Sequence, residues 1–146
     1  MSGTEFSAED GRAAVEAIIS RSPYLSWLGL SVSDLQLGRI AAKARWREEW
    51  VANPVIGQTQ GGILASLVDF AANFALFGNM GRPVLTIDLR VDYHRVAVKG
   101  DLIAEGSLVK LGRQVSVCEG RILDEEGRLI ASGRGTFLTA PAEKSK

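Results

Sequence analysis

The residues best suited to carry out chemistry lie at the start of one long apolar run. Gln60, Gly61 and Gly62 directly precede a mainly apolar stretch that ends at Met80. If a helix begins here, its first N–H groups have no partner within the helix and carry the positive end of the helix dipole. Glycines lack a Cβ and let another molecule's oxygen approach those groups, so the segment can stabilise an oxyanion. The alternative is that the glycines only allow close packing where the helix begins.

A polar stripe runs through the same apolar stretch. Small and polar residues recur there at steps of four, three and four, which places them on one helix face: Gly62, Ser66, Asp69 and Asn73. A carboxylate inside an apolar helix normally has a partner or a chemical role. The stripe can face a cavity, or it can face its own copy across a subunit interface. Alternatively, Asp69 is structural and pairs with neighbouring Ser66, Asn73 or arginine side chains.

The distance between the two candidate groups constrains how they can work together. Seven residues at about 1.5 Å rise place Asp69 roughly 10 Å from Gly62 along the helix axis. The Asp69 side chain leans toward the helix N-terminus, but not far enough to close that gap. If both groups serve one reaction, the carboxylate must come from a second copy whose helix runs antiparallel about a two-fold axis. The catalytic hypothesis therefore predicts a homodimer.

Several other kinds of chemistry lack the residues they need. The chain has no GxSxG elbow, P-loop, HExxH or CxxC motif. One Cys118 and one His94 cannot form the usual zinc sets, so we expect no metal and no prosthetic group. His94 is expected to be structural or to lie at a rim. Seventeen Lys and Arg balance seventeen Asp and Glu, which argues against nucleic acid as a partner.

Similar arguments bear on location. A single cysteine cannot form an internal disulfide, and residues 1–7 lack the basic and apolar parts of a secretory signal, so we expect a cytoplasmic protein. The apolar run from Gly61 to Met80 approaches the length of a membrane span. Because Asp69 and Asn73 lie near its middle, we expect a buried core helix and no membrane contact.

The periodicity of apolar residues predicts the elements that must hold these groups. A capping signal at Ser7 begins a first amphipathic helix over residues 8–20. Residues 61–79 show no alternation and are rich in Ala, Leu and Phe, which favours a buried helix. Strands with period-two alternation are predicted over 30–35, 40–46, 84–93, 101–111, 113–123 and 128–139.

Short connections between these strands suit an antiparallel sheet that curls around the one buried helix, an α+β architecture. Within the strand over 84–93, Leu85 and the following odd-numbered residues should face one way, and Thr86 and the even-numbered residues the other. The segment that contains Asn53, Pro54 and Gly57 is predicted to be a loop. We expect frayed ends over residues 1–7 and 140–146.

Several segments together resemble one known family. They are Gln60–Ala71, Thr86–Tyr93, Gly100–Gly106 and Gly133–Phe137. Over about residues 25–139 the chain resembles the PaaI-like branch of the hotdog-fold acyl-CoA thioesterases. The resemblance implies that residues 1–146 form a single hotdog domain, with about five to six antiparallel strands wrapped around one long hydrophobic helix. It also implies assembly into dimers and often tetramers, and hydrolysis of coenzyme A thioesters.

The resemblance also implies roles for individual residues. In that family an Asp in the central helix activates water or attacks the thioester, and Asp69 occupies its position. The glycine at the helix start, here Gly62 or Gly61, would bind the thioester oxygen. Thr86 matches a Ser or Thr that orients the nucleophile, and Asn53 matches an Asn of the upstream loop.

The chain departs from the family pattern at two places. Gln60 stands where the family has a histidine, although its amide N–H can still bond a thioester carbonyl. The loop between Asn53 and Gln60 is one residue longer than the usual pattern. A non-catalytic acyl-CoA binding or scaffolding protein on the same fold is therefore the alternative function. A hotdog dehydratase is disfavoured because His94 lies outside the motif that such enzymes use.

The expected partners are an acyl-CoA and further copies of the chain, as a homodimer or a dimer of dimers. The phosphates of coenzyme A call for basic residues, and the candidates near strand ends are His94, Arg95, Lys99, Arg113 and Arg134. Ser66 and Asn73 on the stripe are further candidates for substrate contacts. The depth of an acyl pocket would depend on the Trp-rich N-terminal segment and on Phe70, Phe74 and Phe77.

Overall fold

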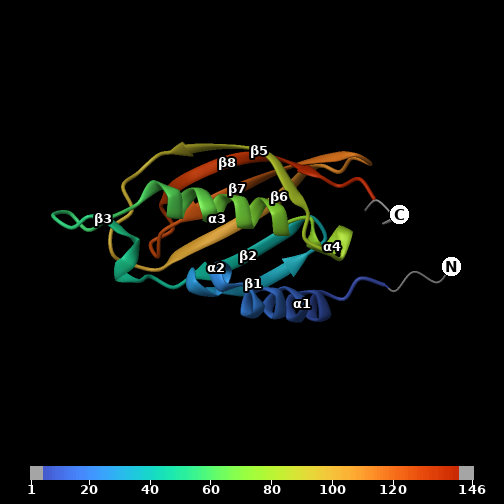
Figure 1. Cartoon of the computed structure of the whole chain (residues 1–146), viewed down its shortest axis with the longest axis horizontal. Helices are drawn as coiled ribbons and strands as arrows, with labels where there is room; N and C mark the ends of the chain where they lie inside the picture. The colour runs from blue at the N-terminus through green and yellow to red at the C-terminus, as the bar shows by residue number, and fades with distance from the viewer. Residues whose placement is uncertain (1–4, 142–146) are drawn as a thin grey trace.

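The computed structural model describes residues 5–141, in which one curved sheet holds a helix in its hollow (Figure 1). The long helix α3 (Gly61–Phe74) lies against the sheet, and α1 (Ala8–Arg21) lies beside β1 at one edge. All pairings are antiparallel, in the order β1-β2-β6-β7-β8-β5. The six strands are β1 (Leu30–Gln36), β2 (Arg39–Ala44), β5 (Leu85–Tyr93), β6 (Leu102–Lys110), β7 (Val115–Leu123) and β8 (Leu129–Leu138). The predicted α+β architecture is therefore confirmed.

Both N-terminal helices begin at a capping serine, and Ser7 is the one that the sequence predicts. Ser7 caps α1 by accepting a hydrogen bond from the Asp10 N–H at 3.3 Å. A short helix α2 (Pro23–Trp27) follows, with proline in its first turn. Ser22 caps it by accepting from the Leu25 N–H at 3.1 Å. The two caps fix the residues at which α1 and α2 begin.

The apolar run predicted as one helix over 61–79 is divided into two. The Leu76 N–H bonds the carbonyl of Asn73, three residues back, and the chain turns before α4 (Phe77–Met80). The stretch Gly61–Met80 has the length and hydropathy of a membrane span, and more than half of its most apolar window is buried inside the fold. Burial within this sheet accounts for the apolar composition of the run.

Glycines let α3 lie directly on the sheet. Gly106 of β6 pairs with Gly120 of β7, which pairs with Gly133 of β8, so the three form a row across the sheet. A Cβ on Gly106 would overlap the carbonyl oxygen of Ala71, and one on Gly133 would press on the Val68 side chain at 2.8 Å. The bare backbone of three strands therefore sets how close the helix sits, and it leaves the polar stripe on the side away from those three strands.

One prediction about strand faces is wrong. Regular alternation would place Thr86 on the same face as Asp88, away from the helix. A β-bulge shifts the pairing with β8 at this point, so Thr86 pairs with Phe137 whereas Asp88 pairs with Thr136. The extra residue, Ile87, reverses the alternation. Thr86 therefore faces α3, and Asp88 lies on the outer face of the sheet.

The segment before α3 also differs from its prediction as a loop. It contains the short elements η1 (Glu48–Trp50), β3 (Val51–Asn53) and β4 (Gln58–Thr59). The Gln60 N–H donates to the carbonyl of Trp50 at 2.8 Å, and the Thr59 N–H donates to the carbonyl of Ala97 at 2.8 Å. Strands of two and three residues are too short for alternation to reveal. Their pairing fixes the point at which α3 begins.

Parts of both ends are ordered where fraying was predicted. Residues 1–4 and 142–146 lie outside the described residues. Phe6 packs against the core, and the Ala140 N–H donates to the carbonyl of Gln114 at 3.0 Å. The expectation of fraying is wrong for Phe6 and Ala140, because packing and backbone pairing hold them.

Candidate active site

The start of α3 is capped by its own neighbour. Gln60 is the N-cap residue, and its side-chain oxygen Oε1 accepts a hydrogen bond from the Gly62 N–H. The carbonyl of Gly61 accepts a hydrogen bond from the Tyr93 hydroxyl at 2.8 Å, which joins the start of α3 to the end of β5. The structure thus brings the three predicted residues together. However, the Gly62 N–H, which we expected to bind an oxyanion, already donates to Gln60 of the same protomer.

Asp69 lies about two turns further along α3 and is half-buried. The Thr86 hydroxyl Oγ1 donates a hydrogen bond to Asp69 Oδ1 at 2.7 Å. Within residues 5–141, no hydrogen bond engages the second carboxylate oxygen, Oδ2. The structure therefore brings the predicted carboxylate together with the hydroxyl predicted to orient it.

Ser66 lies between these two groups on the stripe. Its hydroxyl donates to the carbonyl of Gly62 at 2.8 Å and lies 2.6 Å from the hydroxyl of Tyr24 in α2. Trp27 stacks on Tyr24 with ring centroids 6.2 Å apart. Sequence reasoning missed the contacts of Tyr24 and of Tyr93 with α3, because each tyrosine reaches the helix from a distant segment and no local spacing records such a contact.

Asn73 lies at the far end of the stripe. Its Nδ2 donates to the carbonyl of Val84 at 2.6 Å, and its Oδ1 accepts from the Val84 N–H at 3.2 Å. Both ends of the amide are engaged, so Asn73 anchors the start of β5 to α3. This placement favours a structural role for Asn73 over the substrate contact that we expected.

The stripe is open between two flanking elements. On one side Tyr93 of β5 bonds Gly61, and on the other Tyr24 of α2 bonds Ser66. Gly61 and Ser66 are five positions apart, which is about 140° around a helix. Gly62 is exposed and lies between them. Because α3 is unbroken from its start to Phe74, its geometry keeps Gly62 about 10 Å from Asp69 along the axis.

A cavity opens beside the start of α3. It has a volume of about 370 Å³, and its lining includes Thr59, Gly61, Leu64, Tyr93, His94 and Arg95. The Thr59 hydroxyl is buried and has no hydrogen-bond partner among residues 5–141. His94 Nε2 lies 2.7 Å from Ser132 Oγ, at the rim as expected. Arg95 is exposed and lines the same cavity as Gly61, so this candidate for binding phosphate lies next to the start of α3.

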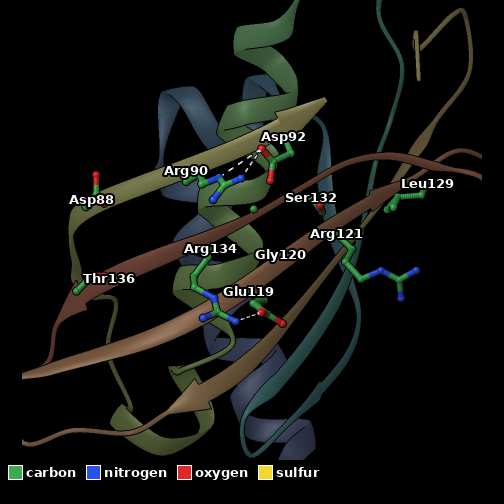
Figure 2. A pocket seen from close by; sticks show the side chains of 11 residues that line it. Asp88, Arg90, Asp92, Glu119, Gly120, Arg121, Leu129, Ser132, Arg134 and Thr136 are labelled. Carbon is green, nitrogen blue, oxygen red and sulfur yellow. Dashed lines mark hydrogen bonds and ion pairs between the residues drawn. The ribbon is translucent and has the colours of Figure 1, made fainter. Parts of the chain in front are cut away.

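Arg134 lies on the opposite face of the sheet. Figure 2 shows this outer face, where Arg134 of β8 pairs with Glu119 of β7, and Arg90 pairs with Asp92 of the same strand at 3.3 Å. These side chains line a second cavity of about 600 Å³. The sheet separates this cavity from α3, so Arg134 does not meet the stripe of its own protomer.

The remaining candidates have contacts outside α3. Arg113 stands in the turn between β6 and β7, at the end of the sheet where β5 begins. Lys99 Nζ lies 5.2 Å from the ring of Trp46. The Asn53 side chain accepts a hydrogen bond from the Val55 N–H at 3.1 Å, within the exposed β3–β4 turn. In the part of the chain that the structure describes, none of these three side chains bonds α3.

Two further observations bear on the chemistry. Burial raises the pKa of the Cys118 thiol to about 12, so the thiol stays protonated near neutral pH and is a poor nucleophile. Across residues 5–141, no group of three His, Cys, Asp or Glu side chains could hold a metal ion. On the stripe itself, Asp69 is the one residue with an ionisable side chain.

Comparisons with known proteins identify the family. The sequence profile of the thioesterase superfamily matches residues 57–131, just over half of the chain. A predicted esterase of Halobacterium salinarum is 36% identical, over 92% of this chain and 95% of its own length. A medium/long-chain acyl-CoA thioesterase of Salmonella typhimurium is 26% identical, over 84% of this chain and 89% of its own.

A solved structure adds the fold. The E. coli PaaI protein of the phenylacetic acid degradation operon superposes with a TM-score of 0.82, over 92% of this chain and 96% of its own, at 18% identity. The sheet wrapped around α3 is thus the hotdog fold, as the resemblance implied. The profile match and the 36% identity then show that the chain is related to thioesterases and esterases, which are hydrolases. This chain belongs to the thioesterase superfamily and has the hotdog fold that it shares with PaaI.

Proposed function

We propose that the protein hydrolyses acyl-CoA thioesters to a free acid and coenzyme A. The observation that carries this proposal is the 2.7 Å hydrogen bond from Thr86 to Asp69, on the polar stripe of a helix that begins with two glycines. The bond holds one carboxylate oxygen, so the other can take a proton or attack carbon. The acyl-CoA thioesterase among the relatives supports the substrate class.

In the proposed reaction, Asp69 takes a proton from a water molecule as the water oxygen attacks the thioester carbon. The thioester oxygen gains negative charge and is held by the Gly62 N–H. The C–S bond then breaks, the acid forms, and the coenzyme A sulfur leaves with the proton that Asp69 carried. In a second form of the reaction, an Asp69 oxygen attacks the carbon directly, the C–S bond breaks and coenzyme A leaves as a thiolate. Water then hydrolyses the resulting anhydride, which releases the acid and restores the Asp69 carboxylate, and the proton given up by water goes to the thiolate. Neither form needs a metal or a cofactor.

Gln60 would have to move during binding. In the free protein its Oε1 occupies the Gly62 N–H. A bound thioester oxygen would take over that N–H, because one donor cannot serve both acceptors well. The released Gln60 side chain could then turn its amide N–H toward the same oxygen. This exchange would give Gln60 the oxyanion role that the family pattern gives to the helix start.

The proposed site requires two copies of the chain. Because Gly62 and Asp69 stand about 10 Å apart on one helix, each Asp69 would serve a thioester held by the other protomer. The edge strand β5 offers a surface for pairing, since its Leu85 and Ile87 are 72% and 56% exposed. The opposite edge, β1, packs against α1. Two β5 strands paired about a two-fold axis would form the homodimer, and two such dimers the expected tetramer.

The coenzyme A part of the substrate would pass through the cavity beside the start of α3. Arg95 lines this cavity and is exposed. A phosphate of coenzyme A is a suitable charge partner for its guanidinium group. Of the basic candidates, Arg95 is therefore the one that we assign to coenzyme A.

The test is a panel of acyl-CoAs with a dye that traps free thiols. We expect the wild-type protein to release coenzyme A, and Asp69→Ala to lower kcat by at least about 100-fold, the usual contribution of a general base. The matched control is Asp34→Ala on β1, where the carboxylate only accepts a hydrogen bond from Gln36 at 3.2 Å. Equal turnover by wild type and Asp69→Ala, with unchanged melting temperatures, would contradict the role of Asp69.

A non-catalytic acyl-CoA binding or scaffolding protein is the second candidate. The observation that favours it is the cap at the start of α3, where Gln60 occupies the Gly62 N–H. This candidate predicts saturable binding of acyl-CoAs in a calorimeter together with no release of coenzyme A from any member of the panel.

A further inference from the structure

Tyr24 connects the N-terminal helices to the middle of the polar stripe. Its hydroxyl lies 2.6 Å from Ser66 Oγ, and Ser66 lies about one turn from Gly62 on one side and from Asp69 on the other. The reaction proposed above does not use Tyr24. Its side chain is 49% exposed, so about half of it is open to solvent beside the stripe.

The ring of Tyr24 is held in place by contacts within the fold. Trp27 stacks on it nearly in parallel, at an interplanar angle of 13°. The Arg47 guanidinium lies 4.5 Å from the centre of the Trp27 ring and donates to the carbonyl of Trp27 at 2.9 Å. Arg47 also pairs with Glu49 at 2.6 Å. The ring is therefore fixed before any substrate binds, which is what a surface that selects substrates requires.

We propose that Tyr24 determines which acyl groups the protein accepts, by giving an apolar acyl chain an aromatic surface beside the thioester. The inference rests on the proposed function, in which the thioester oxygen binds at Gly62. Tyr24 meets the stripe only about one helical turn from that point. It stands on the side of the stripe opposite Tyr93 and the cavity lined by Arg95. With coenzyme A on the cavity side, the acyl group extends toward Tyr24.

The chemistry of the ring indicates the class of acyl group. The exposed part of a tyrosine side chain is mostly apolar carbon, and covering it with hydrocarbon removes both surfaces from water. Ser66 donates its own proton to the carbonyl of Gly62, so the Tyr24 hydroxyl donates to Ser66 Oγ and cannot donate to a polar group on the acyl chain. The surface therefore favours an unsubstituted hydrocarbon chain long enough to cover the ring, and it gives an acetyl group little to contact.

The experiment compares octanoyl-CoA with acetyl-CoA as substrates of wild type, Tyr24→Ala and Tyr24→Phe. We expect Tyr24→Ala to lower kcat/KM for octanoyl-CoA about tenfold and for acetyl-CoA less than about twofold, as for other losses of apolar substrate contact. Tyr24→Phe keeps the ring and should keep the wild-type ratio of the two substrates. The matched control is Leu37→Ala, which removes a 56% exposed apolar side chain at the other end of β1.

Binding gives a second readout that does not depend on turnover. The Asp69→Ala variant is expected not to hydrolyse its ligand. Calorimetry therefore measures Kd for both acyl-CoAs with Asp69→Ala and with the double variant Asp69→Ala, Tyr24→Ala. Weaker binding of octanoyl-CoA alone supports the inference, even if the wild-type protein proves to hydrolyse nothing and the proposed reaction fails. Equal losses for both acyl-CoAs, or no loss for either, would overturn the role of Tyr24 while leaving the hydrolysis intact.

Discussion

The polar residues on the stripe of α3 differ in how much hydrogen-bonding capacity they keep for a substrate. Asn73 uses both ends of its amide on Val84. Ser66 donates to the carbonyl of Gly62 and meets Tyr24. Asp69 receives one bond, from Thr86. At the scale of residues, Ser66 and Asn73 are therefore engaged within the fold, and the chemistry proposed above falls to the Asp69 carboxylate.

Gln60 provides a prediction at this scale, because its oxygen and a substrate oxygen would compete for the Gly62 N–H. In Gln60→Glu, a carboxylate should cap α3 better than the amide does, since negative charge is favourable at a helix N-terminus. The same charge would repel a developing oxyanion. We expect the melting temperature to hold or rise while kcat/KM falls about 100-fold, the usual loss for a disrupted oxyanion hole.

The control for this prediction is Gln60→Ala, which frees the Gly62 N–H but removes the amide. Its kcat should fall less than that of Gln60→Glu, because no charge opposes the oxyanion. Thermal melts followed by circular dichroism, together with the thiol assay, give both quantities. A Glu variant as active as wild type would mean that no oxyanion forms next to Gln60.

At the scale of elements, the bulge in β5 decides which side chain meets Asp69. With regular alternation, Thr86 would face outward beside Asp88. The extra residue in the pairing of β5 with β8 turns Thr86 toward α3 instead. A backbone irregularity at one position thus supplies the hydroxyl that orients the carboxylate.

The glycine row under α3 provides a prediction for stability. A Cβ on Gly106 would overlap the backbone oxygen of Ala71, and neither backbone can move far without breaking the sheet or the helix. We expect Gly106→Ala to lower the free energy of unfolding by about 2 kcal/mol or more, as overpacking of a core does. Urea unfolding measures this. The control is Ser107→Ala, an exposed neighbour on the same strand, which should change the stability little. Equal stability of both variants would mean that α3 does not lie on the glycines.

Long periodic segments made most of the fold predictable from sequence. The helix over 8–20 and the strand over 84–93 each repeat their apolar pattern several times, and the structure differs from both by only a residue at an end. Asp69 stood out for a similar reason, since a charge is rare in an apolar helix. The orientation of Thr86 was predicted wrongly because a bulge is a property of strand pairing, which no single strand records.

Contacts between distant segments account for what sequence reasoning missed at the site. Tyr24 is 42 positions from Ser66, and Tyr93 is 32 positions from Gly61. Arg134 was a candidate for binding coenzyme A because it is basic and near a strand end, yet it lies on the outer face of the sheet beside Glu119. Composition and spacing indicate which residues can act. Which of them meet depends on the sheet order and register.

At the scale of the whole molecule, the two edges of the sheet differ. The β1 edge is covered by α1, where the Glu16 carboxylate accepts a hydrogen bond from the Val32 N–H at 2.5 Å. The β5 edge carries the exposed side chains of Leu85 and Ile87. Exposed apolar edge strands favour pairing with another chain. This asymmetry gives the sheet one edge suited to a two-fold partner, and the strand at that edge also carries Thr86.

Mixed dimers provide the strictest test of a shared site. In the proposal each site takes Gly62 from one chain and Asp69 from the other, so Asp69→Ala and Gly62→Val are each inactive alone. The new valine meets mainly the flexible end of the Gln60 side chain, so the fold should tolerate it. After the two variants are unfolded and refolded together, half of the dimers are mixed and each mixed dimer has one intact site. We therefore expect about a quarter of wild-type activity for a two-fold dimer.

The control mixture is Asp69→Ala with Asp69→Asn. Both chains then lack the Asp69 carboxylate, so the mixed dimers should regain no activity. The thiol assay measures recovery, and analytical ultracentrifugation confirms that dimers formed. Recovery near a quarter requires that the carboxylate and the helix start of one site belong to different chains, because no single variant chain holds both. If dimers form and no activity returns, both groups must act within one protomer. The helix would then have to bring groups about 10 Å apart to one carbon, so the roles of Gly62 and Asp69 would need to be reassigned.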